Sequence, residues 1–221
     1  MNDEYVRELE ATVRKFMTPL KDIPFPVVIK ALSGFSVIPF DGESKEDRIL
    51  LDKLKKGMQK ATESAYATGI ITNRPNEAGN HIEPFVRSAL TEIGMKATLP
   101  ITKQGKHKVA GYPDIEIKDD YSRVTYLECK TYNLKSKESS FRTFYLQPSD
   151  EFKITSDARH LLAGFEIKTV VRSGKTAFVP ISWHIYTLEK LRVQVKHEFN
   201  ASNKQLYLTG ALLAEGSVPN K

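Results

Sequence analysis

Two acidic residues and a lysine stand at a spacing that suits phosphodiester hydrolysis. Asp114 follows Pro113, thirteen residues lie between Asp114 and Glu128, and Lys130 comes two positions later. Hard divalent cations such as Mg²⁺ prefer carboxylate and carbonyl oxygens, so Asp114, Glu128 and the backbone carbonyl of Cys129 are candidate metal ligands. A metal held there would activate water, and Lys130 would hold that water or stabilise a phosphate oxygen. These residues therefore predict metal-dependent hydrolysis of a phosphodiester.

The elements around these residues must be strands for the three side chains to meet. The apolar period is two over 96–101, 108–117 and 123–132, with turns at 104–106 and 119–120. Alternation along a strand puts Glu128 and Lys130 on one face, about 7 Å apart, and the turn returns Asp114 beside them. The alternative is that Glu128 and Lys130 are ordinary polar residues on the wet face of an amphipathic strand, since Glu-x-Lys is a common pattern.

The remaining pattern predicts a mixed α/β (α+β) fold, with a central mixed sheet flanked by helices and a helical N-terminal region. Helices are expected over 3–17, 45–67, 75–94 and 155–163, and further strands over 164–172 and 176–187, with a hairpin near 191–208. Four prolines make long regular structure unexpected over 18–44. We expect one compact domain overall, divided into a helical or irregular region, 1–72, and a core with C-terminal hairpins, 73–221.

Two helix starts carry specific signals. Ser44 is a candidate N-cap, with Asp47 three residues later as an acidic variant of the capping box. Pro84 removes one backbone donor from the third expected helix. That helix is therefore either kinked at Pro84 or begins near residue 83.

Composition limits the class of protein. The 221 residues carry a net charge of +6, which favours a polyanionic partner without establishing one. Cys129 is the sole cysteine, which excludes internal disulfides and multi-cysteine zinc sites and fits a reducing cytosol. The N-terminus is acidic and lacks the pattern of a signal peptide, and no apolar run is long enough to span a membrane. A cytoplasmic protein is expected.

The chain resembles the PD-(D/E)XK nuclease superfamily, which includes most type II restriction endonucleases. Pro113-Asp114 and Glu128-Cys129-Lys130 carry the resemblance, and the element order matches the family core of a helix, three strands, a helix and a strand over about 75–172. The family often has an acidic residue on its first core helix. Glu83 corresponds to that residue, and Glu77 is the second choice.

The resemblance implies a type II restriction endonuclease that hydrolyses double-stranded DNA and leaves 5′-phosphates. It implies Mg²⁺, with Mn²⁺ as a substitute, Asp114 and Glu128 as metal ligands, and Lys130 as the catalytic lysine. It also implies a bacterial or archaeal host with a partner DNA methyltransferase. A palindromic target would require a homodimer with one site for each strand.

Two polar segments are candidates for DNA contacts. One is the basic turn at 103–108, and the other is the loop that leaves the catalytic strand over 131–153. The candidate DNA-binding residues are Lys106, Lys108, Tyr132, Asn133, Lys135, Lys137, Arg142 and Lys153. Polar surface loops without a function are the alternative for both segments.

Two other functions fit the same residues. One is a structure-specific or repair nuclease of the same superfamily, such as a junction resolvase, which a panel of branched and mismatched DNA would identify. The other is a DNA-binding module that does not cleave. Binding alone requires no pair of carboxylates beside a polyanion, so the acidic residues favour an enzyme.

Overall fold

The computed structural model describes residues 3–16, 20–72, 78–133, 144–149, 151–172, 174–195, 202 and 205. Two compact units divide the chain: residues 23–192 form one, and 1–22 with 193–221 form the other. The helices are α1 (Asp3–Phe16), α2 (Phe25–Ser33), α3 (Lys45–Thr68) and α4 (Ala78–Glu92). The strands are β1 (Ile23–Pro24), β2 (Lys96–Thr98), β3 (Ile115–Lys118), β4 (Val124–Tyr132), β5 (Arg159–Arg172), β6 (Lys175–Thr187) and β7 (Arg192–Val193).

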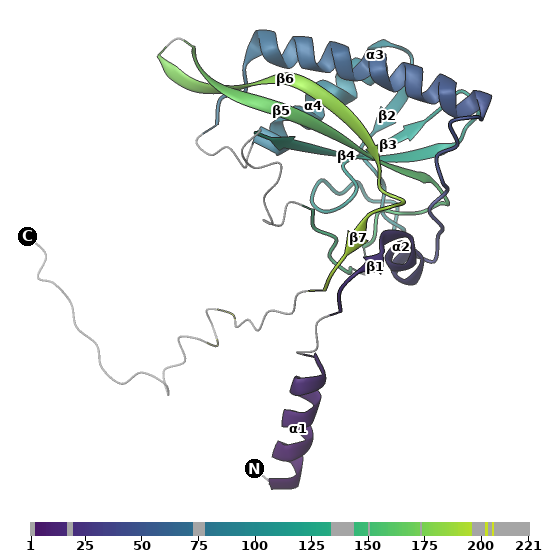
Figure 1. Cartoon of the computed structure of the whole chain (residues 1–221), viewed down its shortest axis with the longest axis vertical. Coiled ribbons are helices and arrows are strands. Elements are labelled where there is room, and N and C mark those ends of the chain that lie inside the picture. The colour runs from purple at the N-terminus through teal and green to yellow at the C-terminus, as the bar shows by residue number, and fades with distance from the viewer. Residues whose placement is uncertain are drawn as a thin grey trace, which may run out of the picture. The chain divides into compact units, whose positions relative to one another are not determined.

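A five-stranded sheet in the order β2-β3-β4-β5-β6 forms the centre of the 23–192 unit (Figure 1). Strands β4 and β5 run parallel, and the other neighbours are antiparallel. The predicted mixed α/β class, with a mixed sheet flanked by helices, is confirmed. Strands β2 and β3 are shorter than predicted, and residues 108–114 form a loop that leads into β3.

Helices α3 and α4 cover one face of this sheet (Figure 1). Leu54 and Met58 of α3 and Ile82 and Leu90 of α4 are fully buried. They pack in one cluster with alternate residues of the strands, which include Ile115, Ile117, Leu127, Cys129, Leu161, Ala163 and Phe165. This alternation is the strand period that the sequence predicts. Cys129 lies in the core, as its apolar neighbours indicate.

Aromatic rings cover part of the opposite face. Phe25 of α2 contacts Tyr112, Phe144 and His160 edge to face, with ring centroids 5.6–5.8 Å apart. Tyr126 of β4 also packs on His160, and the Tyr112 hydroxyl lies 2.6 Å from His160 Nδ1. Burial lowers the pKa of His160 to about 3, so this side chain is neutral. Strand β4 is therefore buried on both faces, which argues against a simple wet face.

Helix α2 is a correction to the expectation of little regular structure over 18–44. Pro24 is the N-cap of α2 and Pro26 lies in its first turn. The first N–H groups of a helix have no partner within it, so prolines there remove no hydrogen bond. Gly34 ends the helix with φ 82°, and its N–H donates to Lys30 O at 3.0 Å.

The helix predicted over 155–163 is wrong, because β5 begins at Arg159. Ala158, Leu161 and Leu162 fit a helical stripe, but Leu161 pairs with Leu127 in the parallel ladder between β4 and β5. Ladder hydrogen bonds and burial decide between the two periods over so short a run. The described part of the crossover from β4 to β5 contains no helix.

The other predicted elements have mixed outcomes. Helix α4 runs from Ala78 through Pro84, so a start near residue 83 is wrong. The hairpin near 191–208 lies largely outside the described residues, and the boundary between 72 and 73 stays a prediction. Within the described ranges, no helix is both long enough and apolar enough to cross a membrane.

Candidate active site

The antiparallel hairpin of β3 and β4 brings Asp114 beside Glu128. Ile115 of β3 pairs with Leu127 of β4. In this antiparallel ladder the next pair of residues is therefore 114 and 128. The Asp114 side chain accepts a hydrogen bond at its Oδ2 from the Cys129 N–H, at 2.8 Å. This contact holds the Asp114 carboxylate against β4, where the sequence predicts the second carboxylate.

Glu128 and Lys130 form a close ion pair on the same face of β4. Lys130 Nζ lies 2.5 Å from Glu128 Oε1, and the Glu128 residue is 3% exposed. The other carboxylate oxygen, Glu128 Oε2, is buried and accepts no hydrogen bond from any described residue. A buried carboxylate oxygen without a donor is costly, and it marks a place where a cation or a proton would be stabilised.

The electrostatics of the site follow from burial and from like charges in close proximity. Burial, followed by the charge of Asp114, raises the pKa of Glu128 to about 7. Burial also raises the pKa of Asp114, while the Cys129 N–H and Lys130 oppose that shift. Burial would lower the pKa of Lys130, but the charge and hydrogen bond of Glu128 outweigh it and raise this pKa. Lys130 is therefore a fixed positive charge.

Glu83 of α4 belongs to the same electrostatic cluster. The first turn of α4 lies beside the end of β4. The contact is close at Gly79, where a Cβ atom would lie 3.7 Å from Thr131 Oγ1. Burial and then the charge of Asp114 raise the pKa of Glu83 to about 7, and Lys130 opposes the shift. Glu77, the second choice for the accessory acid, lies outside the described residues.

The residues of the site fit a divalent cation held by few protein ligands. Among the described residues, no group of three or more His, Cys, Asp or Glu side chains is arranged as a metal cage. Mg²⁺ keeps several waters and binds through one or two carboxylates, which matches Asp114 and Glu128. A bound cation would supply a partner for Glu128 Oε2, and its positive charge would lower the raised pKa of Glu128. The role of the Cys129 carbonyl stays a prediction.

The candidate DNA-binding residues lie in different surroundings. Lys106 is exposed in the turn after Ile101, and Lys108 pairs with Glu151 at 3.1 Å. Tyr132 continues the face of Lys130, and its hydroxyl lies 3.0 Å from His184 Nδ1. Asn133 is exposed, Lys153 is buried, and the other candidates lie outside the described residues: Lys135, Lys137 and Arg142. Their role in DNA binding stays a prediction.

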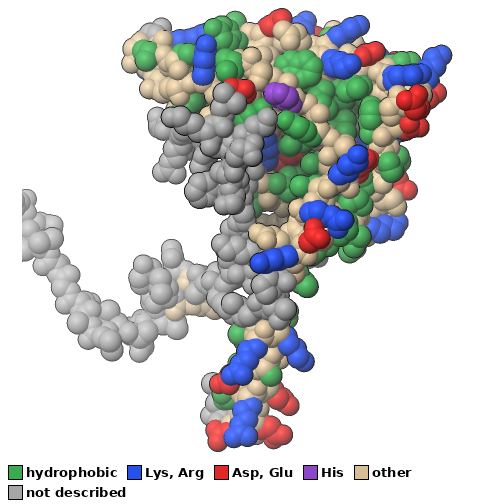
Figure 2. Space-filling view, viewed as in Figure 1, with side chains coloured by type: hydrophobic (Ala, Val, Ile, Leu, Met, Phe, Trp, Pro, Cys, Tyr) green, Lys and Arg blue, Asp and Glu red, His purple; other side chains and the backbone are tan. Residues whose placement is uncertain are grey.

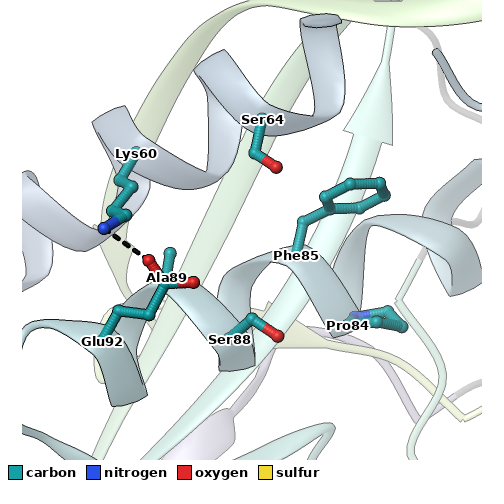
Figure 3. Close-up of a pocket in the computed structure, with 7 residues that line it drawn as sticks. All are labelled: Lys60, Ser64, Pro84, Phe85, Ser88, Ala89 and Glu92. Carbon is teal, nitrogen blue, oxygen red and sulfur yellow. Dashed lines mark ion pairs between the residues drawn. The ribbon is translucent and has the colours of Figure 1, made fainter. Parts of the chain in front are cut away.

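A hollow between α3 and α4 is a separate feature of the surface (Figure 3). Phe85 and Ser88 of α4 line it opposite Ser64 of α3, and Lys60 forms an ion pair with Glu92 across it. None of the predicted catalytic side chains lines this hollow. It therefore does not correspond to the candidate active site.

Comparisons with known proteins identify the family of this chain. The family model described as "Type II restriction enzyme MjaV family" matches residues 19–210. The chain belongs to this family of type II restriction enzymes. It is 38% identical over 231 residues to the type II restriction enzyme MjaV of Methanocaldococcus jannaschii, covering 97% of this chain and 98% of that protein. The prediction of a type II restriction endonuclease is thereby confirmed.

One solved structure is also similar. It is the tetrameric restriction endonuclease SfiI bound to cognate DNA, at 13% identity and a TM-score of 0.38, covering 66% of each chain.

Proposed function

We propose that this chain cuts double-stranded DNA at a specific sequence, that it requires Mg²⁺, with Mn²⁺ as a substitute, and that it leaves 5′-phosphates. The observation that carries the proposal is the meeting of Asp114, Glu128 and Lys130 at one point of the hairpin. Family membership supports the choice of a restriction endonuclease over a repair nuclease or a non-cleaving module.

Each residue has a role in this proposal. Asp114 and Glu128 would hold the metal ion, with Glu83 as the accessory acid from α4. Bound Mg²⁺ would lower the pKa of a coordinated water and offset charge on the phosphate. Lys130 stays charged beside Glu128, so it can orient the attacking water or donate to a non-bridging phosphate oxygen. Tyr112 and His160 are buried against each other, and the charges of Glu128 and Asp114 act on Tyr112.

The first prediction tests these roles by substitution. Asp114→Ala, Glu128→Ala and Lys130→Ala should each lower cleavage of a long mapped DNA in Mg²⁺ by about 100-fold or more, because each removes a charge used in the transition state. Binding measured in Ca²⁺ should persist, and thermal unfolding should confirm the fold. Glu116→Ala is the matched control, since Glu116 lies in β3 and pairs with Lys118 instead. Normal cutting by Glu128→Ala would refute the assignment.

The ends and the target distinguish the possible nucleases. Discrete fragments of a linear DNA, with 5′-phosphates found by sequencing the ends, are expected of a site-specific enzyme. Cutting confined to branched or mismatched DNA would instead identify a structure-specific nuclease. Binding without cutting in both Mg²⁺ and Mn²⁺ would identify a non-cleaving module.

The proposal extends to the partners of the protein. A restriction endonuclease cuts unprotected DNA, so we propose a companion methyltransferase that modifies the same sequence in the host. This substrate would place the protein in the cytoplasm of a bacterial or archaeal cell. A palindromic target requires equivalent chemistry on both strands, which a homodimer with two-fold symmetry supplies.

A further inference from the structure

A second lysine is buried in the same region as the candidate active site. Lys153 is 2% exposed and stands between Phe152 and Ile154, which are 5% and 0% exposed. It lies at the end of the crossover, shortly before β5 begins at Arg159. Lysine is almost never fully buried unless its charge is paired. The surroundings of this ammonium group therefore require an explanation.

The pairing of Lys153 is incomplete in the described part of the chain. Its Nζ donates to Val109 O at 3.4 Å, which is long for a hydrogen bond. No ion pair of the described residues includes Lys153, whereas Lys130 lies 2.5 Å from Glu128. An ammonium group has three donors, and among the described residues the hydrogen bond to Val109 O accounts for one of them.

Through Val109 O, Lys153 contacts the loop that carries Asp114, and the charges of three carboxylates act on its ammonium group. Burial lowers the pKa of Lys153, and the charges of Asp114, Glu128 and Glu83 oppose that shift, in that order. In return, the charge of Lys153 acts to lower the pKa of Asp114 and of Glu83. Lys153 thus borders the acidic cluster without being bound to any one member of it.

We propose that Lys153 is a second cationic residue of the active site, and that its ammonium group donates to a phosphate oxygen of the DNA strand being cut. This inference rests on the proposed function. A phosphate is the anion that the reaction itself brings to the carboxylate cluster. Lys130 precedes the crossover from β4 to β5 and Lys153 lies near its end, so the two lysines would together offset the charge of one phosphate group.

The rival explanation is that Lys153 serves as a structural counter-charge for the three carboxylates. In that case a saturating divalent cation would replace its function, because the cation neutralises the same groups. A direct contact with phosphate would not be replaced, since it acts on the substrate. The two explanations therefore differ in the cleavage rate at saturating Mg²⁺.

The test uses Lys153→Met, which keeps most of the length of the side chain and removes its charge, and Lys153→Gln as a second variant. Single-turnover cleavage is measured in saturating Mg²⁺, DNA affinity in Ca²⁺, and folding by thermal unfolding. We expect the rate to fall about 100-fold or more, with a much smaller change in affinity. Lys53→Met, which removes a partly buried lysine paired with Asp120, should leave the rate unchanged.

The outcomes separate this inference from the proposed function. If a Lys153 variant that folds normally cuts at a rate within about threefold of the unsubstituted enzyme, the inference is overturned. The proposed function still stands in that case, provided that Glu128→Ala is inactive. Full activity of Glu128→Ala would overturn the function itself. A rate that recovers as Mg²⁺ is raised would assign Lys153 to counter-charge and would also overturn the inference.

Discussion

At the scale of single residues, the site places one carboxylate, Glu128, where water can hardly solvate it. Glu128 is nearly inaccessible, it has one oxygen bound to Lys130, and its other oxygen has no donor among the described residues. Such an arrangement is unfavourable for an isolated protein and becomes favourable when a cation binds. The cost of burial thus supports the proposed role of Glu128 more strongly than the Glu-x-Lys spacing does.

The raised pKa values predict a pH-dependent requirement for Mg²⁺. Glu83 and Glu128 each have a pKa of about 7, and a carboxyl group must lose its proton to bind a metal ion. As the pH falls from 8 to 6, protons compete, and the Mg²⁺ concentration for half-maximal cleavage should rise about tenfold for each carboxyl group that must ionise. Mg²⁺ titrations of cleavage at pH 6, 7 and 8 measure this shift.

Glu83→Gln provides the comparison for that titration. It removes one of the two titrating groups, so the dependence on pH should become weaker while some dependence remains. Equal half-maximal Mg²⁺ concentrations at pH 6 and pH 8 in the unsubstituted enzyme would contradict this account of the site.

At the scale of elements, a buried ion network joins α3 to the strands that carry the site. Asp47 is fully buried in the first turn of α3. Its carboxylate accepts hydrogen bonds from Arg159 at 2.8 Å, from Arg123 at 2.7 Å and from the Asp41 N–H at 2.9 Å. Burial raises the pKa of Asp47, but these hydrogen bonds outweigh burial and lower it overall. Ser44 caps the same turn, accepting from the Asp47 N–H at 3.4 Å.

Removing Asp47 should therefore destabilise the fold strongly. Asp47→Ala leaves two arginine side chains without their buried partner, and we expect a loss of about 3 kcal/mol or more in the free energy of unfolding. Urea unfolding measures this loss. Asp52→Ala, which breaks an exposed pair with Lys55 on the same helix, should cost no more than about 0.5 kcal/mol. Equal stability of the two variants would show that the network has no such role.

At the scale of the whole molecule, the positive charge is not gathered into one visible patch. The net charge is +6, and Figure 2 shows lysine and arginine side chains spread among acidic and hydrophobic ones on the face drawn. Spread charge of this kind attracts DNA generally, whereas a defined register on a target sequence requires contacts at fixed positions. A second copy of the chain, related by two-fold symmetry, would supply such contacts on both half-sites.

The corresponding prediction concerns the oligomeric state. Light scattering should give twice the chain mass of 25.0 kDa, either for the free protein or for its complex with a short DNA that contains the target, measured in Ca²⁺. A DNA of equal length without the target is the control for non-specific assembly. A monomer under all these conditions would argue against the homodimer.

The sequence by itself determined the hairpin of the candidate site, because that part of the site is local. A period of two placed Glu128 and Lys130 on one face of β4, and a short turn was sufficient to return Asp114 beside them. Ser44 as the cap of α3 and the turn at 104–106 were predictable for the same reason, since neighbouring residues make those hydrogen bonds.

Contacts between segments far apart in the sequence decided the other parts of the fold and the site. Local sequence patterns do not predict such contacts. The start of β5 became a strand because it pairs with β4 across the crossover, which outweighs the helical spacing of Ala158, Leu161 and Leu162. Glu83, which the resemblance to the nuclease superfamily named as the accessory acid, comes close to the acidic cluster because α4 packs against the sheet. Lys153 is buried beside that cluster because the chain returns there before β5, and burial is a property of the folded chain that residue type alone does not reveal.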